Sequence, residues 1–327
     1  MKIRNTLFIT AIAVSIALTG IFFMSGKEES VDNTAIIEQN IRTEIEEIKS
    51  YPIPDNINFC GEKMPLDRWD IRERLDRELN TFAYLHATTM LYFKRANRIF
   101  PIIEPILKKN NIPADFKYLC VIESNLDTRA VSSANAVGLW QFMSATAKSY
   151  GLEITSEVDE RYNIVKATEA ACKYFNDAYR TYSNWISVAA SYNAGMGRIS
   201  SELRNQMADE AYDLLLVPET SRYMFRITAI KEIFENPRKY GFSLKKENFY
   251  PLIPTNKTEV RSSIPDLAAY ATQKGLNYFQ LKEFNPWLRS DKLTVSAGKS
   301  YFLDLPKPED LFVNPNRITV YDSKWIK

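Results

Sequence analysis

The sequence predicts a mainly α-helical protein with a small α+β segment near its C-terminus. Between residues 113 and 236, apolar side chains recur at three- and four-residue intervals, the spacing of one helix face. The period-two alternation that is typical of strands is absent there. After Pro237 the pattern changes, and two short helix patterns and a strand pattern follow. These observations predict a helical core followed by a smaller module.

The composition is that of a folded globular protein and excludes several classes of site. Of the 327 residues, 45% are hydrophobic and 25% charged. The net charge is only +2, so the basic surface of a nucleic-acid-binding protein is not indicated. The single histidine, His86, excludes a His-rich metal site, and no nucleophile motif accompanies it. We expect His86 on an interhelical or surface face, and no metal or cofactor.

The N-terminus has the pattern of an export signal. Lys2 and Arg4 precede an uncharged, mostly apolar run over residues 7–24. This run is longer than most signal-peptide cores and nearly long enough to span a bilayer. Residues 1–26 are therefore predicted to be a signal peptide or a membrane anchor, and the protein is expected to be exported.

A polar spacer and a first helical region are predicted over residues 27–84, with the helical pattern starting at Asp67. Proline lacks the amide hydrogen that a helix interior needs. Pro101, Pro105 and Pro113 are therefore expected to separate the helices that follow.

Four apolar stripes predict the helices of the core. They are Phe116, Leu119, Cys120 and Glu123; Ala167 to Ala178; Trp185 to Tyr192, ending at Gly195 and Gly197; and Tyr223 to Phe234, ended by Pro237. Two of the three cysteines, Cys120 and Cys172, lie on these stripes. Together with Cys60 they are interpreted as free thiols rather than as a disulfide framework.

The C-terminal part is predicted to contain a linker (241–257), a compact module (258–306) and a tail (307–327). The module begins near Val260 and has helix patterns over residues 264–274 and 278–284. A strand pattern follows over residues 299–305. The tail has no pattern that predicts structure.

Glu123 is the candidate acid/base. It follows Phe116, Leu119 and Cys120 on an apolar stripe, so its carboxyl group is expected to be partly desolvated, which raises the pKa. A general acid that protonates a glycosidic oxygen needs such a pKa. From this position alone, a helix-end glutamate paired with a neighbour is the plainer interpretation.

Three ordered motifs add to this evidence. They are Glu123-Ser124, Gly138-Leu139-Trp140-Gln141-Phe142-Met143 and Ala190-Ser191-Tyr192-Asn193-Ala194-Gly195. They resemble the motifs of lytic transglycosylases with a goose-type-lysozyme-like (SLT) fold. The stretch over residues 134–141 and Asp159-Glu160-Arg161 look most like the D-type membrane-bound branch. The resemblance covers residues 85–240. It implies a lysozyme-like helical catalytic domain that acts on peptidoglycan glycan strands in the periplasm.

The resemblance also implies roles for single residues. Glu123 would act as acid and then as base, and Ser132 would contact substrate or the carboxylate. Gln141 and Met143 would line the groove around the substrate. Tyr192 would hydrogen-bond near the carboxylate, and Asn193 would hold substrate or the local turn. Pro218-Glu219-Thr220 with Tyr223 resembles the family's P-E-T-x-x-Y segment and gives Glu219 and Tyr223 supporting roles. The sequence departs from the family pattern at Ser191, where the family has alanine, and at Trp140, which is bulkier than its usual counterpart.

Only one carboxylate lies in this set of motifs, whereas hydrolytic glycosidases usually use two. The resemblance implies that Glu123 protonates the bond between N-acetylmuramic acid and N-acetylglucosamine and then deprotonates the C6 hydroxyl, which leaves a 1,6-anhydro end. A hydrolytic muramidase and a non-catalytic peptidoglycan-binding protein are the alternatives.

The C-terminal module resembles a degenerate LysM module, a type that binds glycans containing N-acetylglucosamine. The usual Y-x-V-x-x-G-D opening is missing from it. A small structural cap on the enzyme is the alternative interpretation.

Overall fold

The structure, a computed structural model, describes residues 49–312 and 314–327. The predicted signal or anchor, with its apolar run over residues 7–24, and residues 27–48 of the predicted spacer lie outside this range. No helix of the described part is long and apolar enough to cross a membrane. Residues 50–327 form one unit.

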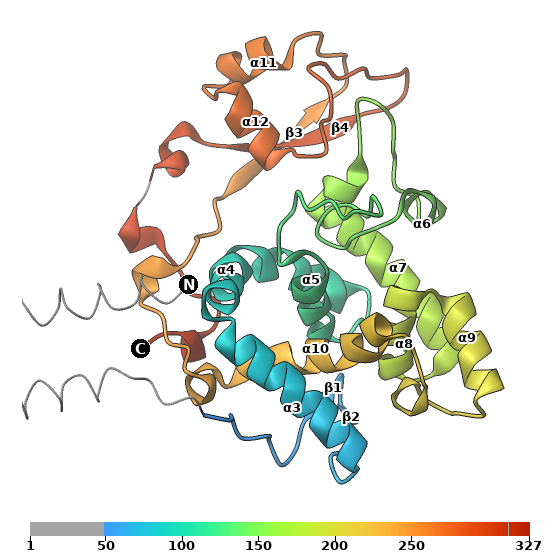
Figure 1. The fold of residues 1–327 in the computed structure, drawn as a ribbon. Coiled ribbons are helices and arrows are strands. Elements are labelled where there is room, and N and C mark those ends of the chain that lie inside the picture. Colours follow the sequence, from blue (N-terminus) through green and yellow to red (C-terminus); the bar gives the residue numbers. More distant parts are fainter. Residues whose placement is uncertain (1–48, 313) are drawn as a thin grey trace, which may run out of the picture. The chain divides into compact units, whose positions relative to one another are not determined.

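Helices dominate this unit, and the predicted mainly α fold with a small α+β module is confirmed (Figure 1). The helices are α3 (Trp69–Tyr84), α4 (His86–Lys109), α5 (Lys117–Ser124), α6 (Ser144–Ser149), α7 (Ile164–Tyr182), α8 (Trp185–Ala194), α9 (Met196–Asn205), α10 (Pro218–Glu235), α11 (Leu267–Gln273) and α12 (Tyr278–Phe284). The strands form two antiparallel pairs, β1 (Asn58–Phe59) with β2 (Glu62–Lys63) and β3 (Thr255–Val260) with β4 (Tyr301–Pro306).

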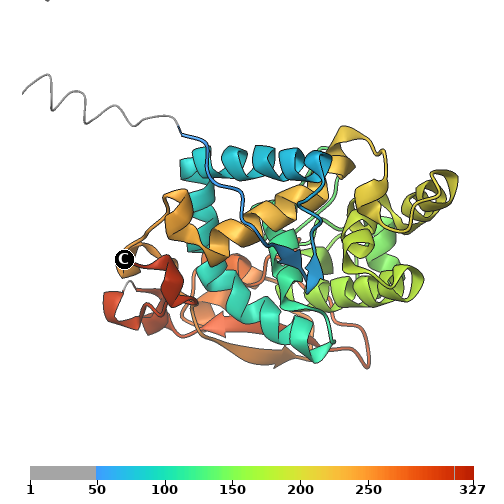
Figure 2. The same ribbon diagram turned by 90° about the horizontal axis from the view of Figure 1, so that it is seen from below.

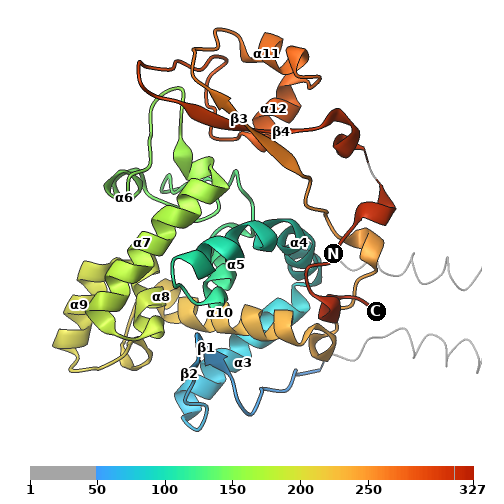
Figure 3. The same ribbon diagram turned by 180° about the vertical axis from the view of Figure 1, so that it is seen from behind.

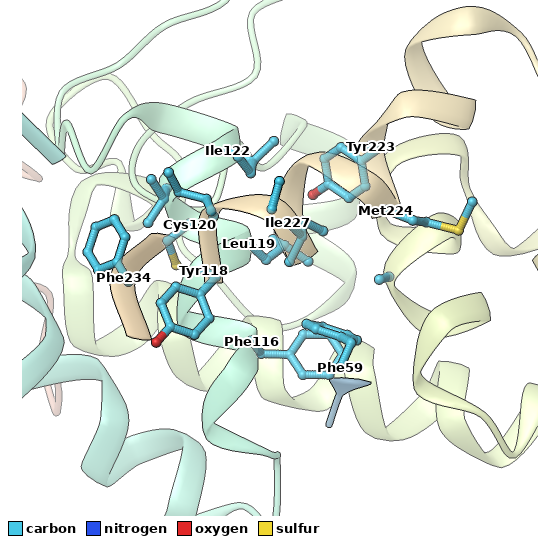
Figure 4. Close-up of a cluster of buried hydrophobic side chains, with 14 of the residues drawn as sticks. Phe59, Phe116, Tyr118, Leu119, Cys120, Ile122, Tyr223, Met224, Ile227 and Phe234 are labelled. Carbon is cyan, nitrogen blue, oxygen red and sulfur yellow. The ribbon is translucent and has the colours of Figure 1, made fainter. Parts of the chain in front are cut away.

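Helix α5 lies inside the helical core and packs against α10 and α4. Leu119 and Cys120 on its apolar stripe are fully buried. Figure 4 shows the side chains of α5 facing those of α10, among them Tyr223 and Ile227. The ring of Phe116, just before α5, lies 4.3 Å from that of Phe175 on α7. The stripe that predicted α5 is therefore the face that joins the helices of the core.

The prediction that Pro101 and Pro105 separate helices was wrong, because α4 runs through both. Neither proline has an amide hydrogen to donate, which normally destabilises a helix interior. Here Phe100, Ile103 and other apolar residues of the same helix are buried in the core. We attribute the continuity of α4 to this packing. Pro113 does precede a break, and a 3₁₀ turn over Ala114–Phe116 leads into α5.

The predicted end of the third stripe is also shifted. Gly195, with φ of +86°, separates α8 from α9, so the first break falls where it was predicted. Gly197, by contrast, lies inside α9. Glycine lowers helix propensity but does not end a helix whose other residues bury an apolar face, as Ile199 does here.

The C-terminal module has the order β3-α11-α12-β4 and a hydrophobic core of its own. The two strands pair from Thr255↔Pro306 to Val260↔Tyr301, and Leu267, Leu281 and other apolar residues fill the core beneath them. Only Val260 of β3 is buried. Because the strand lacks alternating burial, its length was not apparent from the sequence.

The segment predicted as a linker (241–257) packs on the helical core. Phe242, Leu244 and Phe249 within it are buried. The tail returns to the same place, since Leu244 donates a backbone hydrogen bond of 3.1 Å to Trp325. Figures 2 and 3 show the C-terminal end beside the chain that follows α10. Both chain segments that flank the module are therefore attached to the helical domain.

Trp325 is the anchor of the tail. Its ring lies 5.4 Å from the rings of both Phe93 and Phe234, and its Nε1 donates a 3.0 Å hydrogen bond to the Phe234 carbonyl. This contact unites the end of the chain with α4 and α10.

We expect Trp325→Ala to lower the free energy of unfolding by about 3–5 kcal/mol, because it leaves a large cavity in the core. Urea unfolding followed by circular dichroism measures this. Phe312→Ala is the control, since that side chain is 78% exposed and should change the midpoint little. Equal midpoints for the two variants would show that the tail is not part of the core.

Candidate active site

Glu123 lies in the last turn of α5, which ends in an unusual turn. Asn125 and Leu126 follow with φ of 55° and 57°, the left-handed region that costs most residues about 1–2 kcal/mol. Helix α4 holds this turn through two hydrogen bonds. The Tyr92 hydroxyl donates to Asn125 Oδ1 at 2.7 Å, and Arg95 donates to the Asn125 carbonyl at 2.9 Å. The direction of the chain immediately after Glu123 is thus fixed by another helix.

The carboxyl group of Glu123 is half-buried and has one side-chain partner among the described residues. Tyr223 of α10, itself buried, donates a hydrogen bond from its hydroxyl to Glu123 Oε1. Burial raises the pKa of Glu123 to about 7; the hydrogen bond from Tyr223 and the charge of Arg226 oppose this rise, and Glu219 adds to it. The raised pKa agrees with what the apolar stripe predicted. Glu219 itself is exposed on the first turn of α10.

Tyr192 lies near the carboxyl group of Glu123 but makes its hydrogen bond to the backbone. Its hydroxyl donates to the carbonyl of Trp140 at 2.7 Å, and its ring packs 5.1 Å from that of Tyr174. Burial and, second, the charge of Glu123 raise the pKa of Tyr192. The phenol is therefore a neighbour of the carboxyl group, while Tyr223 makes the direct contact. The sequence analysis had assigned Tyr223 only a supporting role.

The predicted groove residues Ser132, Gln141 and Met143 lie on or beside one loop before α6. Ser132 Oγ accepts a hydrogen bond from the Ala136 amide at 3.0 Å, which closes a turn within the loop. Met143 directly precedes α6 and is 46% exposed. Ser132 thus shapes the loop, and Met143 contributes an exposed apolar side chain to it.

Gln141 bonds to the loop with one end of its amide. The residue has a φ of +48°, and its Nε2 donates to the carbonyls of Gly138 and Ala130 at 2.8 and 3.2 Å. Its Oε1 accepts no hydrogen bond from the described part of the chain. The half-buried amide of Asn193, near the end of α8, likewise has no hydrogen-bond partner in residues 49–312 and 314–327. Both groups are available to a ligand.

Arg161 bonds to two backbone carbonyls of this loop. The sequence analysis did not assign a role to this residue. It forms a buried ion pair with Asp159, with a 2.7 Å contact between Nη2 and Oδ2. Its Nη1 donates to the carbonyls of Asn135 and Phe142, both at 3.2 Å. At Gly138 a Cβ atom would lie 2.1 Å from the Arg161 carbonyl oxygen, so the loop can approach this closely only with glycine there. The Asp159-Glu160-Arg161 segment therefore supports the loop.

None of the other candidate groups is hydrogen-bonded to Glu123 in the described part of the chain. Asp127 faces Arg95, at 3.8 Å, and His86 is exposed at the start of α4. Cys60, Cys120 and Cys172 are free thiols. No group of three or more histidine, cysteine or acidic residues that could hold a metal ion occurs within the described ranges.

Comparisons with known proteins agree with this geometry. Residues 100–215 match the family model of the transglycosylase SLT domain, and residues 256–309 match that of the soluble lytic transglycosylase C-terminal LysM-like domain. The membrane-bound lytic murein transglycosylase D of Escherichia coli (strain K12) is 30% identical over 262 residues, which are 76% of this chain and 55% of the relative. The chain thus spans about half the length of that relative.

Two further similarities are weaker. A protein of Alteromonas sp. (strain M-1), named for tributyltin chloride resistance, is 28% identical over 205 residues, which cover 62% of this chain and 95% of that protein. A solved structure of an inactive mutant of the lytic transglycosylase Slt from Pseudomonas aeruginosa aligns with a TM-score of 0.38 and 18% identity, over 45% of this chain and 25% of its own.

The two domain matches fall on the helical core around Glu123 and on the β3-α11-α12-β4 module. The chain therefore carries a transglycosylase SLT domain and, C-terminal to it, a LysM-like domain.

Proposed function

We propose that this protein is a lytic transglycosylase. It cleaves the β-1,4 bond between N-acetylmuramic acid and N-acetylglucosamine in peptidoglycan and leaves 1,6-anhydro-N-acetylmuramic acid ends. The observation that carries the proposal is the half-buried carboxyl group of Glu123, with a pKa of about 7 and a hydrogen bond from Tyr223, within an SLT domain. Such a carboxyl group can give and take a proton near neutral pH.

In the first step, protonated Glu123 gives its proton to the glycosidic oxygen as the bond from that oxygen to C1 breaks. The N-acetylglucosamine side leaves as an alcohol, and positive charge develops at C1 of the muramic sugar. The acetamido group of that sugar can share this charge. Glu123 is now a carboxylate, and the Tyr223 hydroxyl donates to it. A hydrogen bond to the charged form favours that form, which assists the proton transfer.

In the second step, Glu123 takes the proton of the C6 hydroxyl while that oxygen bonds to C1. The ring closes, Glu123 regains its proton, and no water is consumed. One carboxyl group therefore serves both steps, which fits a site where Asp127 is turned away to Arg95.

The substrate is proposed to bind to the side-chain groups of the loop before α6 and of α8 that have no hydrogen-bond partner in the described part of the chain. Gln141 Oε1 and the amide of Asn193 would bond to the acetamido and hydroxyl groups of the sugars, and Met143 would pack against a sugar ring. Ser132 and Tyr192 would act by fixing the loop, through their bonds to Ala136 and Trp140.

A hydrolytic muramidase is the second candidate, and one observation favours it. Glu219 raises the pKa of Glu123, so a second carboxylate acts on the site. Glu219 could orient a water molecule for attack at C1. The products separate the two reactions, since hydrolysis leaves a reducing end and transglycosylation an anhydro end that is lighter by one water.

We further propose that the protein is exported and acts in the periplasm, where residues 1–26 either anchor it to a membrane or are removed. The pattern of those residues and the membrane-bound relative from E. coli support this.

The first prediction concerns the products. Wild-type protein incubated with purified sacculi should release muropeptides with anhydro ends, and Glu123→Gln should reduce their amount at least about 1,000-fold, because it removes the proposed general acid. Mass spectrometry of the digest measures both.

Glu73→Gln, on the exposed face of α3, is the matched control and should keep full activity. Reducing ends instead of anhydro ends would identify a hydrolase. Undiminished product from Glu123→Gln would exclude Glu123 as the acid.

The second prediction is a pH profile. Because Glu123 must be protonated to act, kcat/KM should fall as pH rises through about 7. Tyr223 lowers this pKa, so Tyr223→Phe should move the fall to higher pH. Glu219 raises it, so Glu219→Gln should move the fall to lower pH. Rates measured between pH 5 and 9 with soluble glycan strands test this. Shifts of both variants in the same direction would contradict the assignment.

The third prediction separates folding from catalysis. Because folding raises the pKa of Glu123, the native state binds more protons than the unfolded state between pH 4.5 and about 7. The contribution of Glu123 to the free energy of unfolding therefore falls as pH rises through this range. Glutamine does not titrate, so the stability of Glu123→Gln should not fall in this way. At pH 8 the variant should be more stable than wild type by about 1–3 kcal/mol, because each unit of pKa shift corresponds to about 1.4 kcal/mol. Urea unfolding at pH 5 and pH 8 measures it. A variant that is equally destabilised at both pH values would contradict the raised pKa.

A further inference from the structure

A cavity of about 520 Å³ lies outside the site around Glu123, between the SLT domain and the LysM-like module. The turn after α5 (residues 126–128) and Arg98 of α4 form one side. The segment over residues 250–255 forms a second side, and Trp287, which follows α12, a third. This volume is within the range of small-molecule sites, about 300–1,000 Å³. Glu123 does not line the cavity.

The cavity has one lining cation, Arg98, without a direct ion-pair partner in the described residues, although the charge of Glu283 acts on it from a distance. Its acidic groups all have partners: Asp127 with Arg95 at 3.8 Å, Glu283 with Arg129 at 2.8 Å, and Asp304 with Lys257 at 3.6 Å. No carboxylate of the described residues lies within 4.0 Å of Arg98.

The guanidinium of Arg98 is only partly used. Its Nε donates to the Pro251 carbonyl at 3.0 Å, and its Cζ lies 5.5 Å from the ring centroid of Tyr250. Its two Nη groups have no acceptor in residues 49–312 and 314–327. Burial lowers the pKa of Arg98, so the cation is also partly removed from water. A half-buried arginine with free donors is suited to a carboxylate.

Trp287 supplies a second unused donor. The residue is only 3% exposed, and its ring is stacked 5.6 Å from that of Tyr301. Within the described part of the chain, its Nε1 is the one buried side-chain polar atom that has no hydrogen-bond partner. An unpaired buried donor costs about 1–3 kcal/mol. This atom has less than 1 Å² of accessible surface, so a molecule in the cavity would contact the indole through its other atoms.

The wall that carries Trp287 is firmly attached to the SLT domain. The Asp159 amide donates to the Trp287 carbonyl at 2.9 Å. Arg129, just after the α5 turn, bonds to Glu283 and also to the Lys282 carbonyl at 3.0 Å. The cavity is therefore a composite that exists only while the module is docked.

We propose that this cavity binds a carboxylated N-acetyl sugar of the N-acetylmuramic acid type. Arg98 takes its carboxylate, Trp287 forms part of the cavity wall, and Tyr250, which is 38% exposed, packs against the sugar ring. The choice of sugar rests on the proposed function. The cavity is a saccharide site distinct from the bond-cleaving site, although the turn over residues 125–126 directly connects them.

The test follows the indole of Trp287 itself, so that binding near Glu123 cannot be mistaken for binding here. The full chain carrying Glu123→Gln is labelled with ¹⁵N-tryptophan, and the Trp287 signal is assigned by its loss in Trp287→Phe. N-acetylmuramic acid, N-acetylglucosamine and the dipeptide L-alanyl-D-glutamate are titrated separately. We expect N-acetylmuramic acid to shift the Trp287 signal and to bind about tenfold or more tightly than N-acetylglucosamine, because it gains a charge-assisted hydrogen bond.

Arg98→Met should remove the preference for the acidic sugar. Arg261→Met is the matched control, because Arg261 lies on the module surface, paired with Glu259 at 2.9 Å, and should leave the preference intact. A Trp287 signal that N-acetylmuramic acid does not move would overturn the proposal, as would an unchanged preference in Arg98→Met. A response to the dipeptide equal to that of the sugar would assign the cavity to a peptide instead.

Cleavage of sacculi by the wild-type chain is measured in parallel. Cleavage without a Trp287 response refutes this site alone, whereas a Trp287 response without cleavage refutes the proposed function alone.

Discussion

The contact between Glu123 of α5 and Tyr223 of α10 is the interaction on which the site depends. It places a carboxyl group where burial raises its pKa to about 7 and still gives the ionised form a hydrogen-bond donor. Without burial the group would have lost its proton at neutral pH, and without a donor its ionised form would be left poorly stabilised. The same two helices pack through fully buried side chains such as Leu119 and Ile230. The hydrophobic core therefore sets the distance between acid and donor.

Polar contacts then fix the chain on both sides of this carboxyl group. After α5, the left-handed turn at Asn125 and Leu126 is held by Tyr92 and Arg95 from α4. The loop before α6 is held by Arg161 through the carbonyls of Asn135 and Phe142. Irregular backbone of this kind is unfavourable unless its surroundings determine it. The proposed groove is thus built from loops whose shape is set by partners outside them.

The sequence predicted the parts of the fold that depend on a repeated apolar face. Helices α5, α7 and α10 agree with their stripes because each buries one side over several turns. Features that depend on a single partner were not predictable. Either Tyr192 or Tyr223 could have been the hydrogen-bond donor to the carboxyl group of Glu123. Which hydroxyl reaches it depends on the three-dimensional structure, and no sequence pattern predicts it. Trp325 lies in a tail without helical or strand periodicity, and its burial arises only because the chain returns to α4 and α10.

The attachment of the LysM-like module bears on how the proposed enzyme would meet a long glycan. The module contacts three residues of the segment before α7: Lys299 bonds to Glu153, Thr294 to Glu157, and Trp287 to the Asp159 amide. The next residues of that segment include Arg161, which holds the loop of Gln141. A module bound to glycan would therefore be connected to the loop of Gln141 through this segment of the chain and its hydrogen bonds. The two segments that flank the module also pack on the helical core, so the module is attached at three places. A glycan strand that it binds would therefore be presented in a fixed orientation.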